Sequence, residues 1–398
     1  MGALFKQKVA WIGLIAIPVI IVILSFANLG STVSPTPKDM PVVLVNLDKG
    51  AIVPGKGEMN FGKMMEEKMT AEVMPNGQES PLVWTKMDSE QAAIDALDHE
   101  QFYAAVVLPA DMTGKLLSLQ SPKPQPGEAK VLLNQGMNYT GATATGTILD
   151  KVMAAVNGQL REQMLAGIKG RGDVLNTAQA SALAAPLVVK QEIHNPVGTQ
   201  SANGNAPVVL SQMLWIIAFL GTVILWFAAG QAVKAGARPF PMIFGRLIGG
   251  VLVVVPAVLI MMLIAIGVLD LEVPDFWEMT FFLMFAGYAF FLLQTMLYSW
   301  LGLRGTPVVV MMFFFSLPVL ALPEQFLPAV TRDWFLSWVP LRFAADAIRD
   351  LLYFGQGLNL STPAWTLAAI GAGGLVLTLL SGFKKPKAAV KTEAQLSR

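Results

Sequence analysis

The sequence contains no cysteine, and only two of its 398 residues are histidines. The absence of cysteine excludes disulfides, thiolate metal sites and cysteine nucleophiles. His99 and His194 lie on separate segments without other ligands nearby, which favours surface or capping roles over a metal site. No motif for an enzyme rises above chance. We therefore expect no cofactor, no metal and no catalytic residue in this chain.

Charged residues are also scarce. They make up 14% of the chain, whereas ordinary soluble domains have about 25%. The 28 Lys and Arg residues nearly balance the 27 Asp and Glu residues, giving a formal net charge of +1. Such a balance suggests no nucleic-acid partner. Hydrophobic residues, in contrast, make up 54% of the chain.

Those hydrophobic residues gather in six runs that reach or approach the roughly 20 residues needed to cross a bilayer. The runs are Val9–Leu29, Val208–Ala229, Leu247–Leu269, Met279–Leu301, Pro307–Leu322 and Pro363–Gly382. The sequence therefore predicts a polytopic α-helical membrane protein with about six transmembrane helices, in contact with the lipid bilayer. The fifth run is short and contains Pro318, so a broken or re-entrant segment is an alternative there. The first exceeds the usual signal-peptide core, which favours a retained anchor over a cleaved signal peptide.

The runs divide the chain into four parts. Residues 1–33 comprise an N-terminal cytoplasmic segment and the first span, and residues 34–205 form a domain large enough for its own core. Residues 206–383 form a five-helix transmembrane domain, and residues 384–398 a basic tail.

Short loops rich in Lys and Arg stay on the cytoplasmic side of a membrane. The bases near the predicted spans are Lys6, Lys8, Lys234, Arg238, Arg246, Arg304, Lys384, Lys385, Lys387 and Lys391. The remaining short loop, Asp270–Glu278, contains four acidic residues and no base. The pattern predicts a plasma-membrane protein with both termini cytoplasmic and the 34–205 domain extracytoplasmic.

The outer domain shows an α/β pattern. Its short apolar runs typical of strands are Val42–Val45, Ala104–Leu108 and Lys130–Leu133. Between the first two, Phe61, Met64, Met65 and Met69 recur at helical spacing, which indicates an amphipathic helix. Asp88 and Gln91 are spaced as a capping box for a further helix. Strands that alternate with helices predict an α/β core.

In a second part of this domain, the helical repeat extends over a longer stretch of sequence. Apolar residues recur every fourth position at Ile148, Val152, Val156, Leu160, Met164 and Ile168. This stripe predicts a helix over Thr143–Ile168, and Val174–Ile193 is predicted as a second helix. The two would form a long helical hairpin inserted between the first and second spans. The alternative is that the stripe simply covers the α/β core.

One glycine-rich stretch has the spacing of a phosphate-binding loop. Gly50–Lys56 follows a predicted strand, but Gly57 stands where such a loop has the Ser or Thr that holds Mg²⁺. A glycine turn is the favoured interpretation.

Few polar groups occur in the spans of the C-terminal half. The main ones are Gln212, Gln231, Gln294 and Tyr298. They could line a transport pathway, although interhelical hydrogen bonds are the commoner role of such residues. Gly245, Gly249, Gly371, Gly373 and Gly374 permit close packing of helices.

The outer segment 323–361 combines aromatic residues suited to the membrane interface with charges at helical spacing. We predict an interfacial or partly re-entrant helix that either gates a pathway or caps the helices. The residues that carry this prediction are Trp338, Pro340, Arg342, Asp346 and Arg349.

The predicted layout consists of one span, a large outer domain, five more spans and an outer segment with the sequence WVPLR at 338–342. This layout resembles the permease subunit of type-2 ABC exporters. Val42–Ala51 (VVLVNLDKGA) and Tyr103–Met112 (YAAVVLPADM) resemble the YhgE/Pip group. The resemblance implies a dimer with a second permease copy or homologue and a separate cytoplasmic ABC ATPase subunit, which would hydrolyse ATP. The loop Gly230–Arg246, with Lys234, Arg238 and Arg246, would dock that ATPase and couple it to outward movement of a hydrophobic or amphiphilic substrate.

Two alternatives stay open. Many members of the YhgE/Pip group have a much longer outer domain than this chain. The chain could instead be a membrane-anchored envelope binding or scaffold protein, phage-receptor-like or a secretion accessory, without transport of its own. A secondary transporter is disfavoured, because charges within the spans are scarce and no inverted repeat is visible.

Overall fold

The structure is a computed structural model of the chain. It describes residues 22, 36–53, 57–70, 79–121, 123–169, 175–357 and 361–384. The contacts divide the chain into two compact units. The α/β unit comprises Met1–Pro207, Phe315–Trp338 and Arg349–Gly357, and the helical unit comprises Val208–Phe314, Val339–Ile348 and Leu358–Arg398.

The α/β unit is built on a five-stranded mixed sheet with the order β4-β1-β5-β6-β7. Its strands are β1 (Met40–Asn46), β4 (Leu82–Met87), β5 (Ala104–Leu108), β6 (Gly127–Asn134) and β7 (Leu187–His194). β1 runs parallel to both of its neighbours, β5 and β6 are antiparallel, and β6 and β7 are parallel. A separate hairpin joins β2 (Ala51–Val53) to β3 (Gly57–Met59). The strands at Val42–Val45, Ala104–Leu108 and Lys130–Leu133 are thus confirmed.

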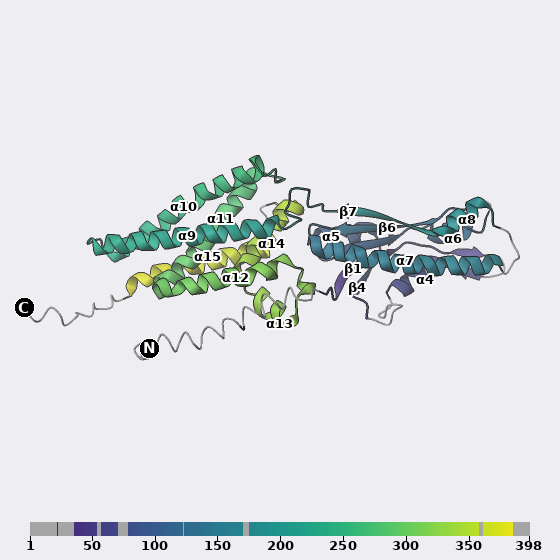
Figure 1. The fold of residues 1–398 in the computed structure, drawn as a ribbon, viewed down its shortest axis with the longest axis horizontal. Helices are drawn as coiled ribbons and strands as arrows, with labels where there is room; N and C mark the ends of the chain where they lie inside the picture. Colours follow the sequence, from purple (N-terminus) through teal and green to yellow (C-terminus); the bar gives the residue numbers. More distant parts are fainter. Residues whose placement is uncertain are drawn as a thin grey trace, which may run out of the picture. The chain divides into compact units, whose positions relative to one another are not determined.

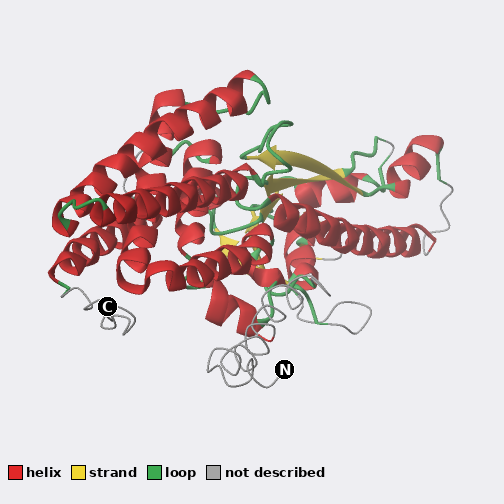
Figure 2. Cartoon of the chain, turned by 60° about the vertical axis from the view of Figure 1, so that its left-hand side comes forward, coloured by secondary structure: helices red, strands yellow, loops and turns green. Residues whose placement is uncertain are grey.

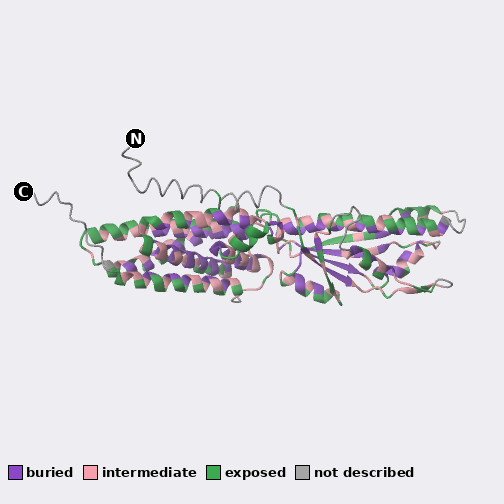
Figure 3. Cartoon of the chain, turned by 90° about the horizontal axis from the view of Figure 1, so that it is seen from below, coloured by how far each residue is buried: buried purple, intermediate pink, exposed green. Residues whose placement is uncertain are grey.

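Side-chain alternation gives the sheet two buried faces. In β1, Met40, Val42 and Leu44 join one hydrophobic cluster, whereas Val43 and Val45 join a second. This follows from the period of two in a strand, which sends successive side chains to opposite faces. α4, α6 and α7 contribute to the first cluster and α5 to the second. The inner strands β1, β5 and β6 are mostly buried, and Figure 3 shows buried strands within this unit.

The helices of this unit are α4 (Phe61–Met69), α5 (Glu90–Asp98), α6 (Met112–Ser118), α7 (Tyr139–Lys169) and α8 (Thr177–Ala184). α4 confirms the amphipathic helix expected there, with Phe61, Met65 and Met69 buried. The predicted cap of α5 was wrong by one residue, because the Ser89 hydroxyl, and not Asp88, accepts the N–H of Ala92 at 3.1 Å.

The predicted second arm of the helical hairpin is wrong. Residues 187–194 form β7, which pairs with β6 from Gly127↔Leu187 to Asn134↔His194. Only the short helix α8 lies within the range predicted as helical. The alternating side chains after Pro186 favour an extended strand, because this segment can form backbone hydrogen bonds with the free edge of β6. The stripe on α7 instead covers the first hydrophobic cluster, and Figure 1 shows α7 beside the strands.

The helical unit consists of long apolar helices joined by short loops (Figure 2). Its helices are α9 (Ala206–Lys234), α10 (Pro239–Gly267), α11 (Phe276–Leu301) and α15 (Thr362–Leu380). α11 continues through a 3-10 turn, Gly302–Gly305, into α12 (Thr306–Ala321). The outer segment contains short turns at Glu324–Phe326, α13 (Ala329–Thr331) and Arg332–Leu336, then α14 (Pro340–Tyr353). α12 and α14 each have residues in both units.

Four candidate membrane spans occur in the residues that the structure describes: Ala206–Lys234, Phe240–Gly267, Phe276–Ala321 and Thr362–Phe383. The predicted first span, Val9–Leu29, lies outside the described residues apart from Val22. The predicted fourth and fifth spans fall in one candidate of 46 residues, which the turn at Gly302–Gly305 interrupts. α12 alone is about 24 Å long at 1.5 Å per residue, shorter than a typical hydrocarbon core. Six spans therefore remain a prediction.

Many apolar side chains on these helices point outward, and Leu252 on α10 is 70% exposed. Large apolar surfaces of this extent are covered by lipid in a membrane protein. The chain is thus a membrane protein, and the candidate spans among the residues that the structure describes lie in its C-terminal half.

Candidate functional site

A row of polar side chains lies on the C-terminal half of α11. Gln294 is fully buried and donates from Nε2 to the carbonyl oxygen of Trp215 on α9, at 3.3 Å. One turn further along, the hydroxyls of Tyr298 and Thr306 share a hydrogen bond of 2.5 Å. Most of this row is therefore paired with neighbouring backbone or hydroxyl groups.

The four polar residues predicted to line a pathway do not come together. Gln294 and Tyr298 lie one turn apart in the helix interface. Gln212 is half-buried and Gln231 exposed on α9, and at 1.5 Å per residue they are roughly 28 Å apart. Among the described groups, Oε1 of Gln294 has no hydrogen-bond partner. The arrangement matches interhelical hydrogen bonding more closely than a continuous polar path.

The connection between α9 and α10 is shorter than predicted. α9 ends at Lys234 and α10 begins at Pro239, so only four residues, 235–238, separate the two helices. The predicted loop Gly230–Arg246 was therefore too long, because α9 continues past Gly230 and Pro239 is suited to a first helical position. Lys234 and Arg238 are exposed beside this connection, and Gly236 supplies a left-handed turn at φ 101°.

Arg246 lies away from that connection, two turns into α10. Its side chain is half-buried, and Nη2 donates to the hydroxyl of Ser299 on α11 at 3.1 Å. The structure thus separates Arg246 from Lys234 and Arg238, with which the sequence analysis grouped it.

Charges along the long helices α9, α10, α11, α12 and α15 and their connections are segregated by sign. Residues 208–269, 279–314 and 361–384 contain no Asp or Glu. Their bases lie at the ends of helices or within two turns of them: Lys234, Arg238, Arg246, Arg304 and Lys384. The charged residues of the connection between α10 and α11 and of the first turn of α11 are all acidic, from Asp270 to Glu278.

The helix predicted in the outer segment is present as α14, and its interfacial or re-entrant placement stays a prediction. On α14, Nε of Arg342 donates to Oδ2 of Asp346 at 3.3 Å, an (i, i+4) ion pair. Pro340 is buried at the start of the helix, and Arg349 is half-buried near its end. Trp338 is 46% exposed, and its indole N–H donates to the carbonyl oxygen of Trp334.

Part of the outer segment belongs to the α/β unit. The hydroxyl of Tyr103, next to β5, donates to Oε1 of Gln325 at 2.8 Å. The backbone of Gln325 also accepts the N–H of Lys38, and Gln356 donates to the carbonyl oxygen of Asp98 at 3.2 Å. Burial raises the pKa of Tyr103. No local pattern in the sequence pointed to these contacts, which join residues more than 200 positions apart.

Asp48 lies at the meeting point of two helix N-termini. Its carboxylate accepts the N–H of Gly62 in α4 at 2.9 Å, and it accepts both the N–H and the hydroxyl of Thr113 in α6. Carboxylates are stabilised at such N-termini. A Cβ on Gly62 would lie 2.4 Å from that of Asp48, which explains the glycine there.

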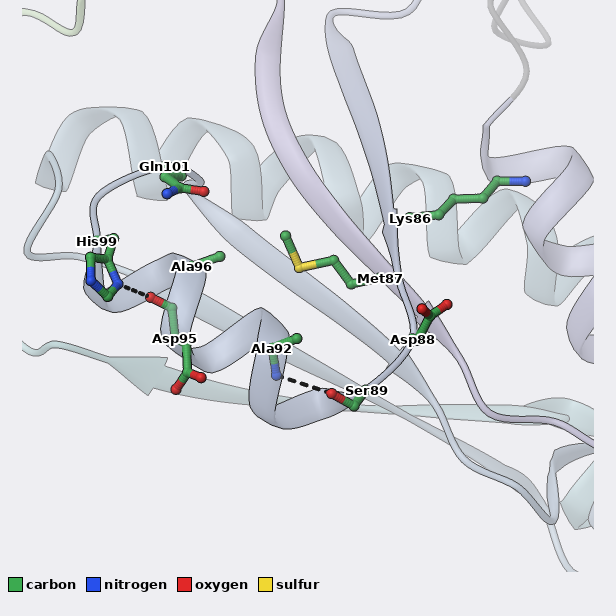
Figure 4. Close-up of a pocket in the computed structure, with 9 residues that line it drawn as sticks. All are labelled: Lys86, Met87, Asp88, Ser89, Ala92, Asp95, Ala96, His99 and Gln101. Atoms are coloured by element: carbon green, nitrogen blue, oxygen red, sulfur yellow. Dashed lines mark hydrogen bonds between the residues drawn. The ribbon is translucent and has the colours of Figure 1, made fainter.

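A shallow pocket lies on the surface between β4 and α5. Figure 4 shows its lining, which includes Lys86, Ser89, Asp95 and His99. The hydrogen bonds drawn there belong to the ends of α5: Ser89 with Ala92, and His99 Nδ1 with the carbonyl oxygen of Asp95 at 2.6 Å. His99 thus has the local capping role expected from the sequence. In the described part of the chain, no three His, Asp or Glu side chains gather as metal ligands.

Residues 8–383 match the model of the ABC-2 family of transporter proteins. The uncharacterised protein YhgE of Bacillus subtilis strain 168 is 28% identical over 128 residues, which cover 32% of this chain but only 16% of YhgE. Among solved structures, a domain of a provisionally assigned ABC type-2 transporter from Thermotoga maritima MSB8 is 18% identical. That match covers 39% of this chain and 86% of the domain, with a TM-score of 0.27.

Proposed function

The chain belongs to the ABC-2 family of transporter proteins, and from this membership we propose that it is the membrane permease subunit of an ATP-driven exporter. In this proposal two permease copies, or one copy and a homologue, assemble with a separate cytoplasmic ATPase. The permease moves a hydrophobic or amphiphilic substrate outward, and ATP is hydrolysed on the other subunit. The family match over residues 8–383 carries the proposal.

The segregated charges support an orientation. We propose that Lys234, Arg238, Arg304 and Lys384 face the cytoplasm, because short basic loops are retained there. The acidic connection Asp270–Glu278 then faces outward. With both termini inside, the α/β unit is extracytoplasmic.

The short connection between α9 and α10 is the proposed contact with the ATPase. Lys234 and Arg238 are both exposed. Only four residues join the two long helices, so the connection has little conformational freedom. A movement of the bound ATPase against this short connection would therefore displace both helices as rigid bodies. Arg246 is not proposed to touch the ATPase, because its side chain donates to Ser299. It would take part in coupling only because it lies on α10, which the connection would move.

The outer segment from Trp338 to Arg349 is the proposed outer gate or cap. Its support is the amphipathic character of α14, with Leu341, Ala344 and Ile348 buried on one side. Exposed Trp338 suits the membrane interface.

The proposal is tested by affinity purification of the full chain from its native host in mild detergent. We expect a soluble ATPase to co-purify and the preparation to hydrolyse ATP in a vanadate-sensitive manner. The double variant Lys234→Glu, Arg238→Glu should lose the ATPase from the complex. Glu272→Lys, a charge reversal in the acidic connection, is the matched control and should retain it.

Failure to recover an ATPase from the unmodified chain would overturn the exporter proposal. An envelope protein bound in its place would favour the membrane-anchored scaffold. If the double variant kept the ATPase and its activity, the proposed docking site between α9 and α10 would be wrong while the exporter proposal stood.

A further inference from the structure

Three helices of the helical unit converge near one end of α10. Ile243 and Leu247 of α10 pack with Leu292 of α11 and Leu379 of α15 in one hydrophobic cluster. The turn that follows α15 also reaches α10, since a Cβ on Gly382 would lie 2.6 Å from the ring of Phe240. We call this region the α10–α11–α15 junction.

Two cations reach consecutive residues of α11 at this junction. Arg246, from α10, donates to the hydroxyl of Ser299. Lys384, which follows α15, donates from Nζ to the carbonyl oxygen of Trp300 at 3.0 Å, and its Nζ lies 4.2 Å from the centroid of the Trp300 ring. The indole N–H of Trp300 donates in turn to the carbonyl oxygen of Leu377 on α15, at 2.9 Å. The side chain of Trp300 is therefore held between the two helices.

Neither cation has a carboxylate partner in the part of the chain that the structure describes. Ser299 and Trp300 supply only a hydroxyl, a carbonyl oxygen and a ring face. Nε of Arg246 is buried and lacks a hydrogen-bond partner among the described groups. A guanidinium that is partly withdrawn from water in this way is costly unless an anion accompanies it.

We propose that Arg246 and Lys384, flanked by Trp300, bind the phosphate of an anionic phospholipid headgroup. The planar guanidinium matches two phosphate oxygens, and the Lys384 ammonium supplies a second, mobile charge. Trp300 is 42% exposed, and such indoles gather at the level of the headgroups. Exposed apolar side chains of α10, among them Ile248, provide a surface for the acyl chains.

The depth of Arg246 favours a lipid over a soluble partner. It follows Pro239 by seven residues, or roughly 10 Å along the helix axis. An Arg at this depth reaches the interface by extending its stem toward the headgroups. A protein docked on the exposed connection at 235–238 would contact Lys234 and Arg238 first. This inference concerns lipid and does not depend on the proposed transport.

The test is native mass spectrometry of the full chain in detergent, titrated with phosphatidylglycerol and, separately, with phosphatidylcholine. We expect phosphatidylglycerol to bind preferentially. Near a membrane surface each base is worth about 1 kcal/mol toward anionic lipid, or about fivefold in affinity. Arg246→Gln and Lys384→Gln should therefore each weaken binding about fivefold, and the double variant about 25-fold.

Lys234→Gln is the matched control, because it removes an exposed base from a helix end outside the junction. It should bind phosphatidylglycerol as the unmodified chain does. Lys384→Gln changes an exposed side chain after the last span, so it tests the site without disturbing helix packing. Arg246→Lys keeps the charge and should bind more strongly than Arg246→Gln.

Equal binding of phosphatidylglycerol to the double variant and the unmodified chain would overturn the site. An equal loss with Lys234→Gln would also overturn it, since the attraction would then be diffuse. Displacement of the lipid by millimolar inorganic phosphate would assign the two bases to free phosphate and overturn the lipid assignment.

Discussion

The carboxylate of Asp48 accepts two hydrogen bonds from Thr113, one from its backbone N–H at 3.0 Å and one from its hydroxyl at 2.5 Å. Thr113 is fully buried, and its hydroxyl oxygen also accepts the N–H of Phe61 at 2.8 Å. Asp48 therefore ties the start of α6 to the start of α4. A turn after β1 thus organises the helix layer on one face of the sheet.

Asp48→Ala should destabilise the α/β unit by about 2 kcal/mol, because it leaves buried donors of Gly62 and Thr113 unpaired. Hydrogen–deuterium exchange of the full chain should show faster exchange in the peptides that contain these two residues. Asp111→Ala, which removes a nearby exposed carboxylate, is the control. Equal protection of both peptides in Asp48→Ala and Asp111→Ala would contradict a structural role for Asp48.

Glu66 should make the stability of the α/β unit sensitive to acid. Hydrogen bonds from Asn46 and Lys86 hold the pKa of this carboxyl below its usual 4.5. A depressed folded-state pKa means that the stabilisation is complete above pH 4.5 and is lost as the pH falls through the folded-state value. Thermal unfolding midpoints between pH 6 and 3 should therefore fall more steeply in the unmodified chain than in Glu66→Gln. Glu67→Gln removes an exposed neighbouring carboxylate and should keep the steep profile. Parallel profiles for all three chains would rule out Glu66 as the source.

Gly374 should be intolerant of any side chain. A Cβ there would lie 2.9 Å from the backbone carbon of Leu292 and the backbone nitrogen of Leu293 on α11. Gly374→Ala must push α15 away from α11, at an expected cost of about 1–3 kcal/mol. Gly373→Ala is the control, because its Cβ would meet no atom within 4 Å. Thermal stability in detergent should drop for the first variant alone, and an equal drop in both would implicate helix flexibility in place of packing.

Gln294→Leu should change thermal stability by less than about 1 kcal/mol. The substitution removes one hydrogen bond to Trp215 and also one buried oxygen without a partner, and interhelical hydrogen bonds in membranes average about 0.6 kcal/mol. If Gln294 serves only the helix interface, vanadate-sensitive ATP hydrolysis by the purified complex should be unchanged. Gln212→Leu on α9 serves as a comparison. Loss of ATP hydrolysis in a stably folded Gln294→Leu would instead support a polar pathway along α11.

Elements that follow from local periodicity were predicted correctly from the sequence. Val42–Val45 and Ala104–Leu108 are apolar at every position because both faces of the sheet are covered. The amphipathic spacing from Phe61 to Met69 likewise predicted α4. The prediction failed where a short segment suits either a helix or a strand. Leu187–His194 forms the strand β7 because it pairs in parallel with β6.

Composition and the order of apolar and charged segments determined, by themselves, the membrane class, the long apolar helices and the segregation of charge. These properties depend on hydrophobicity and charge, which are carried by each residue in its own neighbourhood. Tertiary structure alone decided the hydrogen bonds between Asp48 and Thr113, the contact of Tyr103 with Gln325 and the contact of Arg246 with Ser299. Each joins residues more than 50 positions apart, and such pairings depend on which surfaces meet after the helices and strands have formed.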